Sequence, residues 1–373
     1  MLLRTEPASE GRINAVKAFN QRLAEGKGAY RFPENHIPKR LPQKAGRTIY
    51  QEYYLVLDNA DNVRGAFILK RQLYKIKNEV KRIAHLELPI SEGMVNPEFA
   101  HVAFFLYRAA QDIEPRLYTY GMGGINRPLP KSLKALDWFC TLIPFYFKVI
   151  KAGSFLKNVK LLRSTKPRRI IMDILAASGL GNLGLMLFNI THKRVPANGC
   201  VAENFSTFGD WSDNLWDAYK DEYDFTAARD QSTMNALYPE GERFLKLKIL
   251  DNSKEIGWVI AVVSQLQGHN YFNNMKTGTI LDCWGSKKHY DKIIAVTTAE
   301  IKKIGADIII SNQANPVFDS VFKRNGFLKG PSNLGFCFSP EICEDLETGE
   351  NRNNLALINA HFNRGDGDGA LNV

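Results

Sequence analysis

Two apolar strand-like runs contain the side chains best suited to move a proton. His85 and Glu87 stand two positions apart within residues 83–88, and alternation along a strand places both on one face. Asp282 lies within a second apolar run, residues 279–284, where a charged residue is unusual. Each of the three could act as a general base toward an amine or a hydroxyl. For His85 and Glu87, the alternative is a solvent-facing strand pair.

The cysteines predict neither a metal centre nor a disulfide framework. None forms a CxxC pair, which argues against zinc, and their scatter along the chain favours a reduced, cytoplasmic setting. Cys283 could serve as a nucleophile, but no motif ties a histidine to it. The five cysteines are Cys140, Cys200, Cys283, Cys337 and Cys343.

The elements that must position these residues occur twice. Each copy begins with a β-hairpin whose turn contains Leu-Asp-Asn, at 57–59 and 250–252, because Asp and Asn favour turns between β-rich flanks. A strand, a loop, a helix, a short strand and a helix follow in the same order. We predict an N-terminal α/β domain at 1–147, a helical connector at 148–204 and a C-terminal domain at 205–373. One larger mixed domain is the alternative.

The connector combines positive charge with apolar residues. Eight Lys or Arg residues fall between Lys148 and Arg169. An amphipathic basic helix can lie on an anionic bilayer, but we favour a solvated linker whose apolar side packs on a neighbouring domain. The apolar segment 170–190, which contains three glycines, predicts a buried helix pair.

Composition places the chain among globular proteins with an anionic partner. Of its 373 residues, 45% are hydrophobic and 24% are charged, which excludes wholesale disorder. The net charge of +10 favours nucleic acid, a phosphate-rich cofactor or an acidic membrane surface. The longest apolar stretch, Trp138 to Phe147, is about half the length of a membrane span, so we predict no transmembrane helix.

The second copy contains one further pattern after its hairpin. A strand at 309–311 is followed by Asn315, by Phe322 seven positions later, and by Asn-Gly-Phe at 325–327. This pattern resembles the GNAT superfamily of acetyltransferases. Two such domains in one chain resemble Fem-type aminoacyltransferases and acyltransferases of polysaccharide pathways. The resemblance covers nearly the whole chain outside 150–204. It implies two tandem GNAT-like α/β (α+β) domains with mixed, mostly antiparallel sheets.

The resemblance also implies where a donor binds. In this superfamily the acyl donor and the acceptor meet where the fourth strand parts from the fifth, and backbone N–H groups polarise the donor carbonyl. In the second copy, two lysines at the start of a helix could hold phosphates. The implied cofactor-binding residues are Cys283, Trp284, Gly285, Ser286, Lys287, Lys288, His289 and Asn315.

Both copies depart from the superfamily pattern. Neither has the Gly-rich loop that presents backbone N–H groups to the pyrophosphate, and the first copy has an acid, Glu92, in this loop. The tyrosine that often protonates the leaving thiolate is replaced by Leu133 in the first copy and Phe322 in the second. Acyl transfer therefore needs another acid, or the thiolate leaves unprotonated.

The C-terminal tail, residues 359–369, resembles terminal motifs of tandem polysaccharide-associated acyltransferases. Its glycines predict tight turns that leave Asp366 and Asp368 exposed. These carboxylates could bind or deprotonate an amino-sugar acceptor. A calcium loop is not predicted, because the twelve-residue spacing and the final Glu are absent, and a flexible tail is the alternative.

The leading prediction is a cytoplasmic acyltransferase that acts in polysaccharide biosynthesis. It would transfer an acyl group, most simply acetyl from acetyl-CoA, to an amine or hydroxyl of a sugar or related metabolite, without a metal. A Fem-type transferase that uses aminoacyl-tRNA is the first alternative, since the positive charge suits tRNA phosphates. A non-catalytic binding protein that keeps the fold is the second.

Overall fold

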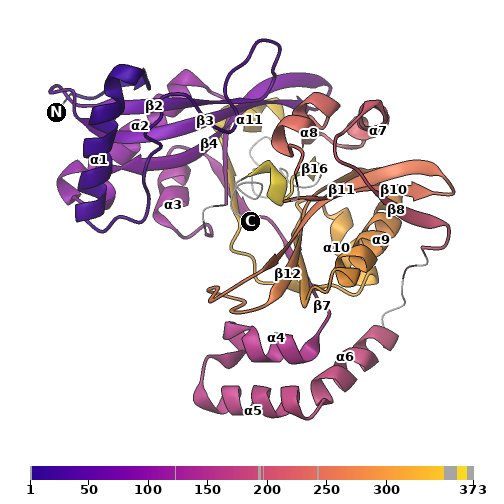
Figure 1. Cartoon of the computed structure of the whole chain (residues 1–373). Helices are drawn as coiled ribbons and strands as arrows, with labels where there is room; N and C mark the ends of the chain where they lie inside the picture. Colours follow the sequence, from indigo (N-terminus) through magenta and orange to yellow (C-terminus); the bar gives the residue numbers. More distant parts are fainter. Residues whose placement is uncertain are drawn as a thin grey trace. The chain divides into compact units, whose positions relative to one another are not determined.

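The chain forms two compact units. The computed structural model describes residues 2–121, 123–191, 195, 197–241, 243–347 and 359–367, and Figure 1 labels its elements. Where described, unit 1 comprises Met1–Leu142, Asp224–Ala228 and Asn333–Ala356, and unit 2 comprises Ile143–Tyr223, Arg229–Ser332 and Leu357–Val373. Each unit contains segments from both halves of the chain. The predicted domains, 1–147 and 205–373, are each one continuous segment.

Unit 1 is built on a mixed sheet. Its strands run in the order β1-β2-β3-β4-β5-β15-β6, and β9 pairs with the end of β3. Only β4 and β5 run parallel among its described strand pairs. The strands are β1 (Arg4–Pro7), β2 (Tyr50–Leu57), β3 (Val63–Ile76), β4 (Glu79–Ser91), β5 (Leu117–Tyr120), β6 (Phe139–Leu142), β9 (Phe225–Ala227) and β15 (Gly335–Phe338).

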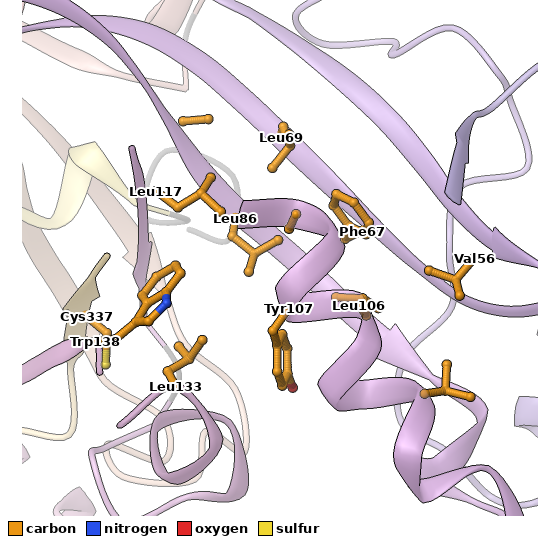
Figure 2. Close-up of a cluster of buried hydrophobic side chains, with 13 residues drawn as sticks. Val56, Phe67, Leu69, Leu86, Leu106, Tyr107, Leu117, Leu133, Trp138 and Cys337 are labelled. Carbon is orange, nitrogen blue, oxygen red and sulfur yellow. The ribbon is translucent and has the colours of Figure 1, made fainter. Parts of the chain in front are cut away.

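Helices cover both faces of this sheet. On one face, Val102 of α2 belongs to a buried cluster. In the same cluster, Leu106 of α2 packs with Phe67 and Leu86 (Figure 2). On the other face, α1 packs on the strand residues that alternate with these. The helices of unit 1 are α1 (Ile13–Glu25), α2 (Ala100–Ile113), α3 (Pro128–Lys134) and α11 (Pro340–Asp345).

Unit 2 repeats the plan. Its strands run in the order β14-β7-β13-β12-β11-β10-β8, and only β12 and β13 run parallel among its described pairs. They are β7 (Phe145–Val149), β8 (Cys200–Asn204), β10 (Leu245–Asp251), β11 (Lys254–Gln265), β12 (Lys276–Gly285), β13 (Ile308–Asn312) and β14 (Leu328–Gly330). A further short strand, β16 (Ala360–His361), lies in the tail and is not part of this sheet. The predicted tandem of mixed, mostly antiparallel domains is confirmed.

Helices also flank the second sheet. From α9, Ile293 packs so closely on Gly257 of β11 that a Cβ there would lie 2.6 Å from its side chain. Trp284 of β12 donates its indole N–H to Leu215 O of α7 at 3.0 Å. The helices are α4 (Ala152–Asn158), α5 (Lys166–Ala177), α6 (Leu180–Thr191), α7 (Asp210–Tyr219), α8 (Gln231–Leu237), α9 (Tyr290–Lys303) and α10 (Val317–Arg324).

The two units exchange one strand each. β6 and β7 are consecutive in the chain, yet β6 lies in the sheet of unit 1 and β7 pairs with β13 and β14 in unit 2. In the same way, β15 follows β14 but lies between β5 and β6. A disulfide joins Cys140 of β6 to Cys337 of β15, a pairing that the scattered cysteines did not predict.

The connector is helical, but its second half is not buried. Val159 is buried, and Phe155 and Leu162 pack beside it on unit 2, which confirms that the first half packs on a domain. The predicted buried pair at 170–190 is wrong, because α5 and α6 form but leave most of their apolar side chains exposed. Among the described residues, no single helix is long and apolar enough to span a membrane, although α5 with Leu180–Leu187, bent by 77°, meets both criteria as a pair.

Candidate functional site

Each unit contains one place where two parallel strands stop pairing and diverge. In unit 1 the last paired residues are His85 of β4 and Tyr118 of β5, and we call the region beyond them the β4–β5 splay. In unit 2 the last pair is Ile280 with Ser311, and the region beyond it is the β12–β13 splay. Ligands of open α/β sheets bind where neighbouring strands diverge.

The β4–β5 splay is bordered by a strained bulge. Leu88 and Pro89 of β4 stand opposite the single residue Phe67 of β3. Leu88 has a φ of 48°, although a residue that precedes proline favours extended backbone. Such a conformation costs on the order of 1–3 kcal/mol and is concentrated at functional sites. Bulges also turn backbone groups away from the regular ladder.

His85 and Glu87 form a buried pair beside this bulge. His85 Nδ1 lies 3.1 Å from Glu87 Oε1, and both residues are at most 5% exposed. Gln51 donates to Glu87 Oε2 at 2.6 Å, and Lys70 Nζ lies 3.6 Å from Oε1. The predicted placement of His85 and Glu87 on one face is confirmed, but the solvent-facing alternative is wrong.

The environment of Glu87 fixes the role of the imidazole. Burial alone would raise the pKa of Glu87, but the hydrogen bond with His85 and the charge of Lys70 outweigh it and lower this pKa to about 2. An ionised carboxylate only accepts hydrogen bonds, so in a neutral imidazole Nδ1 of His85 holds the proton and the lone pair lies on Nε2. The ring of Tyr118 stacks on the imidazole at 4.7 Å and holds its plane.

The acid in the loop after β4 is compensated by two arginines. Glu92 is 4% exposed, and its carboxylate lies 3.0 Å from both Arg22 and Arg64. Its negative charge is therefore balanced within unit 1.

The β12–β13 splay is filled by the chain itself. Ala314 donates its N–H to Phe362 O at 2.8 Å, and Asn315 Nδ2 donates to Ala360 O at 3.1 Å. Gln313 forms a β-bridge with Asn363. The tail 359–367 is thus packed within unit 2, and the alternative of a flexible tail is wrong for these residues.

Asp282 and Asp366 meet on one buried arginine. Arg229 Nε lies 3.1 Å from Asp282, and Nη2 lies 2.9 Å from Asp366. Asn363 donates to Asp282 Oδ1. Burial raises the pKa of Asp282 to about 6. The charge of Asp366 also raises this pKa, whereas the charge of Arg229 lowers it. The prediction that Asp366 is exposed is wrong, since only 4% of it is, and Asp368 lies outside the described residues.

The loop predicted to hold phosphate contacts a carboxylate of the same unit. Ser286 Oγ and Lys287 N both donate to Glu222 at 2.7 Å. Lys287 Nζ also donates to Glu222 O and to Asn359, whereas Lys288 is exposed. The turn before α9 therefore donates its hydrogen bonds to a carboxylate of the same unit.

The remaining candidates in unit 2 lie in its interior. Cys283 and Trp284 are fully buried in β12, and Gly285 ends that strand against Ile293. His289 closes the turn that leads into α9. Burial raises the pKa of the Cys283 thiol well above its ordinary value, which disfavours the thiolate that a nucleophile requires.

Solved structures share this architecture, although sequences do not. A probable N-acyltransferase from Enterococcus faecalis V583 matches with a TM-score of 0.51 and 9% identity, covering 90% of this chain and 72% of its own. Saccharomyces cerevisiae N-myristoyltransferase, solved with myristoyl-CoA and inhibitors, matches at 0.50 and 8%, covering 91% and 80%. The chain has a tandem GNAT fold. No protein-family model and no curated sequence matches it.

In this GNAT fold, the predicted site residues form two separate groups. His85 and Glu87 meet in unit 1, whereas Asp282, Asp366 and the loop 285–289 belong to unit 2. The partners that define each group could not be predicted from the sequence, because contacts between distant segments leave no local pattern. They are Gln51, Lys70, Glu222, Arg229 and Asn363.

No group of three or more His, Cys, Asp or Glu side chains in the described ranges is arranged to hold a metal ion.

Proposed function

We propose that the protein is an acyl-CoA-dependent acyltransferase whose donor binds at the β4–β5 splay of unit 1. The observation that carries this proposal is the buried His85–Glu87 pair beside the strained bulge at Leu88. Acetyl is the simplest acyl group, and an amine or hydroxyl of a sugar or related metabolite is the acceptor. A place in the cytoplasm and in polysaccharide biosynthesis stays a prediction.

The chemistry follows from the lone pair on His85 Nε2. The acceptor attacks the thioester carbonyl carbon and loses its proton to Nε2, directly or through water. Backbone N–H groups near the bulge stabilise the oxyanion of the tetrahedral intermediate. The C–S bond then breaks, and the imidazolium returns the proton to the thiolate of coenzyme A, the role that a tyrosine often has in this superfamily.

Unit 2 is less suited to the donor. Its splay contains the tail residues 360–363, and Glu222 accepts hydrogen bonds from the loop that precedes α9. Among the described residues, no strand pairs with Leu86–Ser91 on the β5 side. The β5 side of Leu86–Ser91 therefore has no paired strand in the described part of unit 1, whereas the tail lies on the corresponding side in unit 2.

A photoreactive coenzyme A analogue tests this assignment. The full chain would be irradiated with the analogue, digested and mapped by mass spectrometry. We expect labelled peptides from residues 84–121, and competition by unlabelled acetyl-CoA. Labels confined to residues 277–325 would place the donor in unit 2 and contradict the proposal.

A calorimetric titration with acetyl-CoA supplies the matched control. The exposed Lys288 of unit 2 changed to Glu should leave the affinity near its native value, because the proposed donor site is elsewhere. A tenfold loss, equivalent to about 1.4 kcal/mol, would restore the loop 285–289 as the phosphate site. Absence of any binding would favour a non-catalytic protein.

A further inference from the structure

The helices α5 and α6 expose an unusual concentration of apolar side chains. Nine of the 19 large hydrophobic side chains that are exposed in the described part of the chain lie between residues 161 and 190. We define the α5–α6 apolar face by six of them, each 52–65% exposed: Ile170, Ile174, Leu183, Met186, Leu187 and Ile190. Exposed patches of this kind mark interaction surfaces.

Positive charge borders this face on one side. The first turn of α5 contains Lys166, Arg168 and Arg169 and no acid. Cations at a helix N-terminus oppose the helix dipole and reduce helix stability. An arrangement that is unfavourable for the isolated helix becomes favourable when an anion lies against it.

The surrounding segment adds to the positive charge. Between residues 148 and 191 the sequence has eight Lys or Arg residues and a single acid, Asp173. That acid is paired with Arg163 at 2.7 Å. The segment beside the apolar face is therefore rich in positive charge, which favours an anionic partner.

The rest of unit 2, where described, does not cover the α5–α6 apolar face. Figure 1 shows α5 on the far side of α4 from the sheet of unit 2. A cavity of about 230 Å³ lies beneath α6, lined by apolar side chains that include Phe155, Leu156 and Leu185. At Gly184 of α6, an added Cβ would meet nothing within 4 Å.

We propose that the α5–α6 apolar face docks on the surface of an anionic lipid bilayer. The apolar side chains enter the boundary between headgroups and acyl chains, and Lys166, Arg168 and Arg169 contact lipid phosphates. Apolar helices bordered by cations bind bilayers in this way, with each cation near the surface adding to the affinity. This inference goes beyond acyl transfer, because it concerns where the protein acts.

Vesicle co-sedimentation of the full chain tests the proposal. We expect binding to phosphatidylcholine vesicles that contain phosphatidylglycerol to be about tenfold or more tighter than to phosphatidylcholine alone. The triple change Lys166→Gln, Arg168→Gln, Arg169→Gln should remove this preference. The triple change Ile174→Gln, Leu183→Gln, Leu187→Gln should abolish binding to both vesicles.

A matched control tests whether any exposed apolar side chain would contribute to vesicle binding. Ile37→Gln with Val80→Gln alters two side chains that are 58% and 62% exposed in unit 1, and should leave vesicle binding unchanged. Circular dichroism should show that every variant is folded. Equal binding to both vesicles, no binding, or dimerisation that depends on the apolar face without vesicle binding would each overturn the proposal.

Discussion

The β4–β5 and β12–β13 splays arise from the same parallel pairing, but they contain different groups. Beside the first, His85 Nδ1 lies 3.1 Å from the carboxylate of Glu87, whose pKa is lowered to about 2. In the second, the tail occupies the space and an arginine binds two carboxylates beside it. One fold, used twice in this chain, therefore has a buried His–Glu pair beside the diverging strands in one copy and a segment of the tail between them in the other.

The two units also differ in the partners of a carboxylate that lies near the start of a helix. In unit 1, Glu92 is bound by two arginines, so its charge is balanced before any ligand arrives. In unit 2, Glu222 itself serves as the anion for the start of α9. In the described part of unit 2, Arg229 and the turn before α9 therefore both bind carboxylates of the same unit.

The largest effect is expected from removing the tail. Ending the chain after Glu347 leaves Arg229 and Asp282 without Asp366 and removes Phe362, which is fully buried. Loss of one partner of a buried ion pair costs about 3–5 kcal/mol, and loss of a buried Phe costs a similar amount. Thermal unfolding followed by circular dichroism should show that unit 2 no longer folds.

Ending the chain after Gly367 is the control, because it keeps every described residue of the tail and removes Asp368. This shorter deletion should keep the native melting temperature. If the longer deletion also kept it, the tail would not be part of the core of unit 2. If the shorter deletion alone abolished turnover, Asp368 would be restored as a site residue.

The next largest effect is a difference in kcat between variants of the His85–Glu87 pair and a variant of Asp282. His85→Gln should lower kcat by about 10²–10⁴, since this is the typical contribution of a general base. Glu87→Gln should cause a smaller loss, because Glu87 only orients the imidazole. Asp282→Asn, measured with the same acyl-CoA and amine, should remain near the native rate. The reverse order would move the chemistry to unit 2.

The smallest effect is a pair of opposite pH dependences. The folded-state pKa of Glu87 is lowered from 4.5 to about 2, so its stabilisation is present above pH 4.5 and is lost as the pH falls toward 2. The folded-state pKa of Asp282 is raised from 3.8 to about 6. Folded Asp282 therefore retains a proton between these values, and stability decreases as the pH rises through them.

Urea unfolding between pH 2.5 and 7 measures both contributions. Each should amount to about 1–3 kcal/mol. Glu87→Gln should remove the acid-side loss, and Asp282→Asn should remove the decrease between pH 4 and 6. An unchanged profile in either variant would show that the corresponding carboxyl does not titrate differently on folding.

Local sequence patterns predicted most of the fold and the pairing of His85 with Glu87. The Leu-Asp-Asn turns and alternating strands fix the two hairpins, and a spacing of two fixes the shared face of His85 and Glu87. The rest depends on contacts between distant segments. The glycines near Asp366 are typical of an exposed turn, yet Arg229, more than 130 residues earlier in the chain, holds it inside. Similarly, apolar composition predicted that 170–190 is buried, but composition does not say whether protein or lipid covers a helix.

The exchange of β7 and β15 has a consequence for biosynthesis. Cys140 and Cys337 lie in neighbouring strands but are 197 residues apart in the chain. While the ribosome makes the intervening residues, the first sheet lacks the strand between β5 and β6 and presents unpaired edges, which favour aggregation. Neither half can finish folding until the last quarter of the polypeptide has emerged. A gene cut between the two sequence repeats would therefore yield two incomplete sheets, and the nascent chain is an expected client of chaperones that protect exposed strand edges.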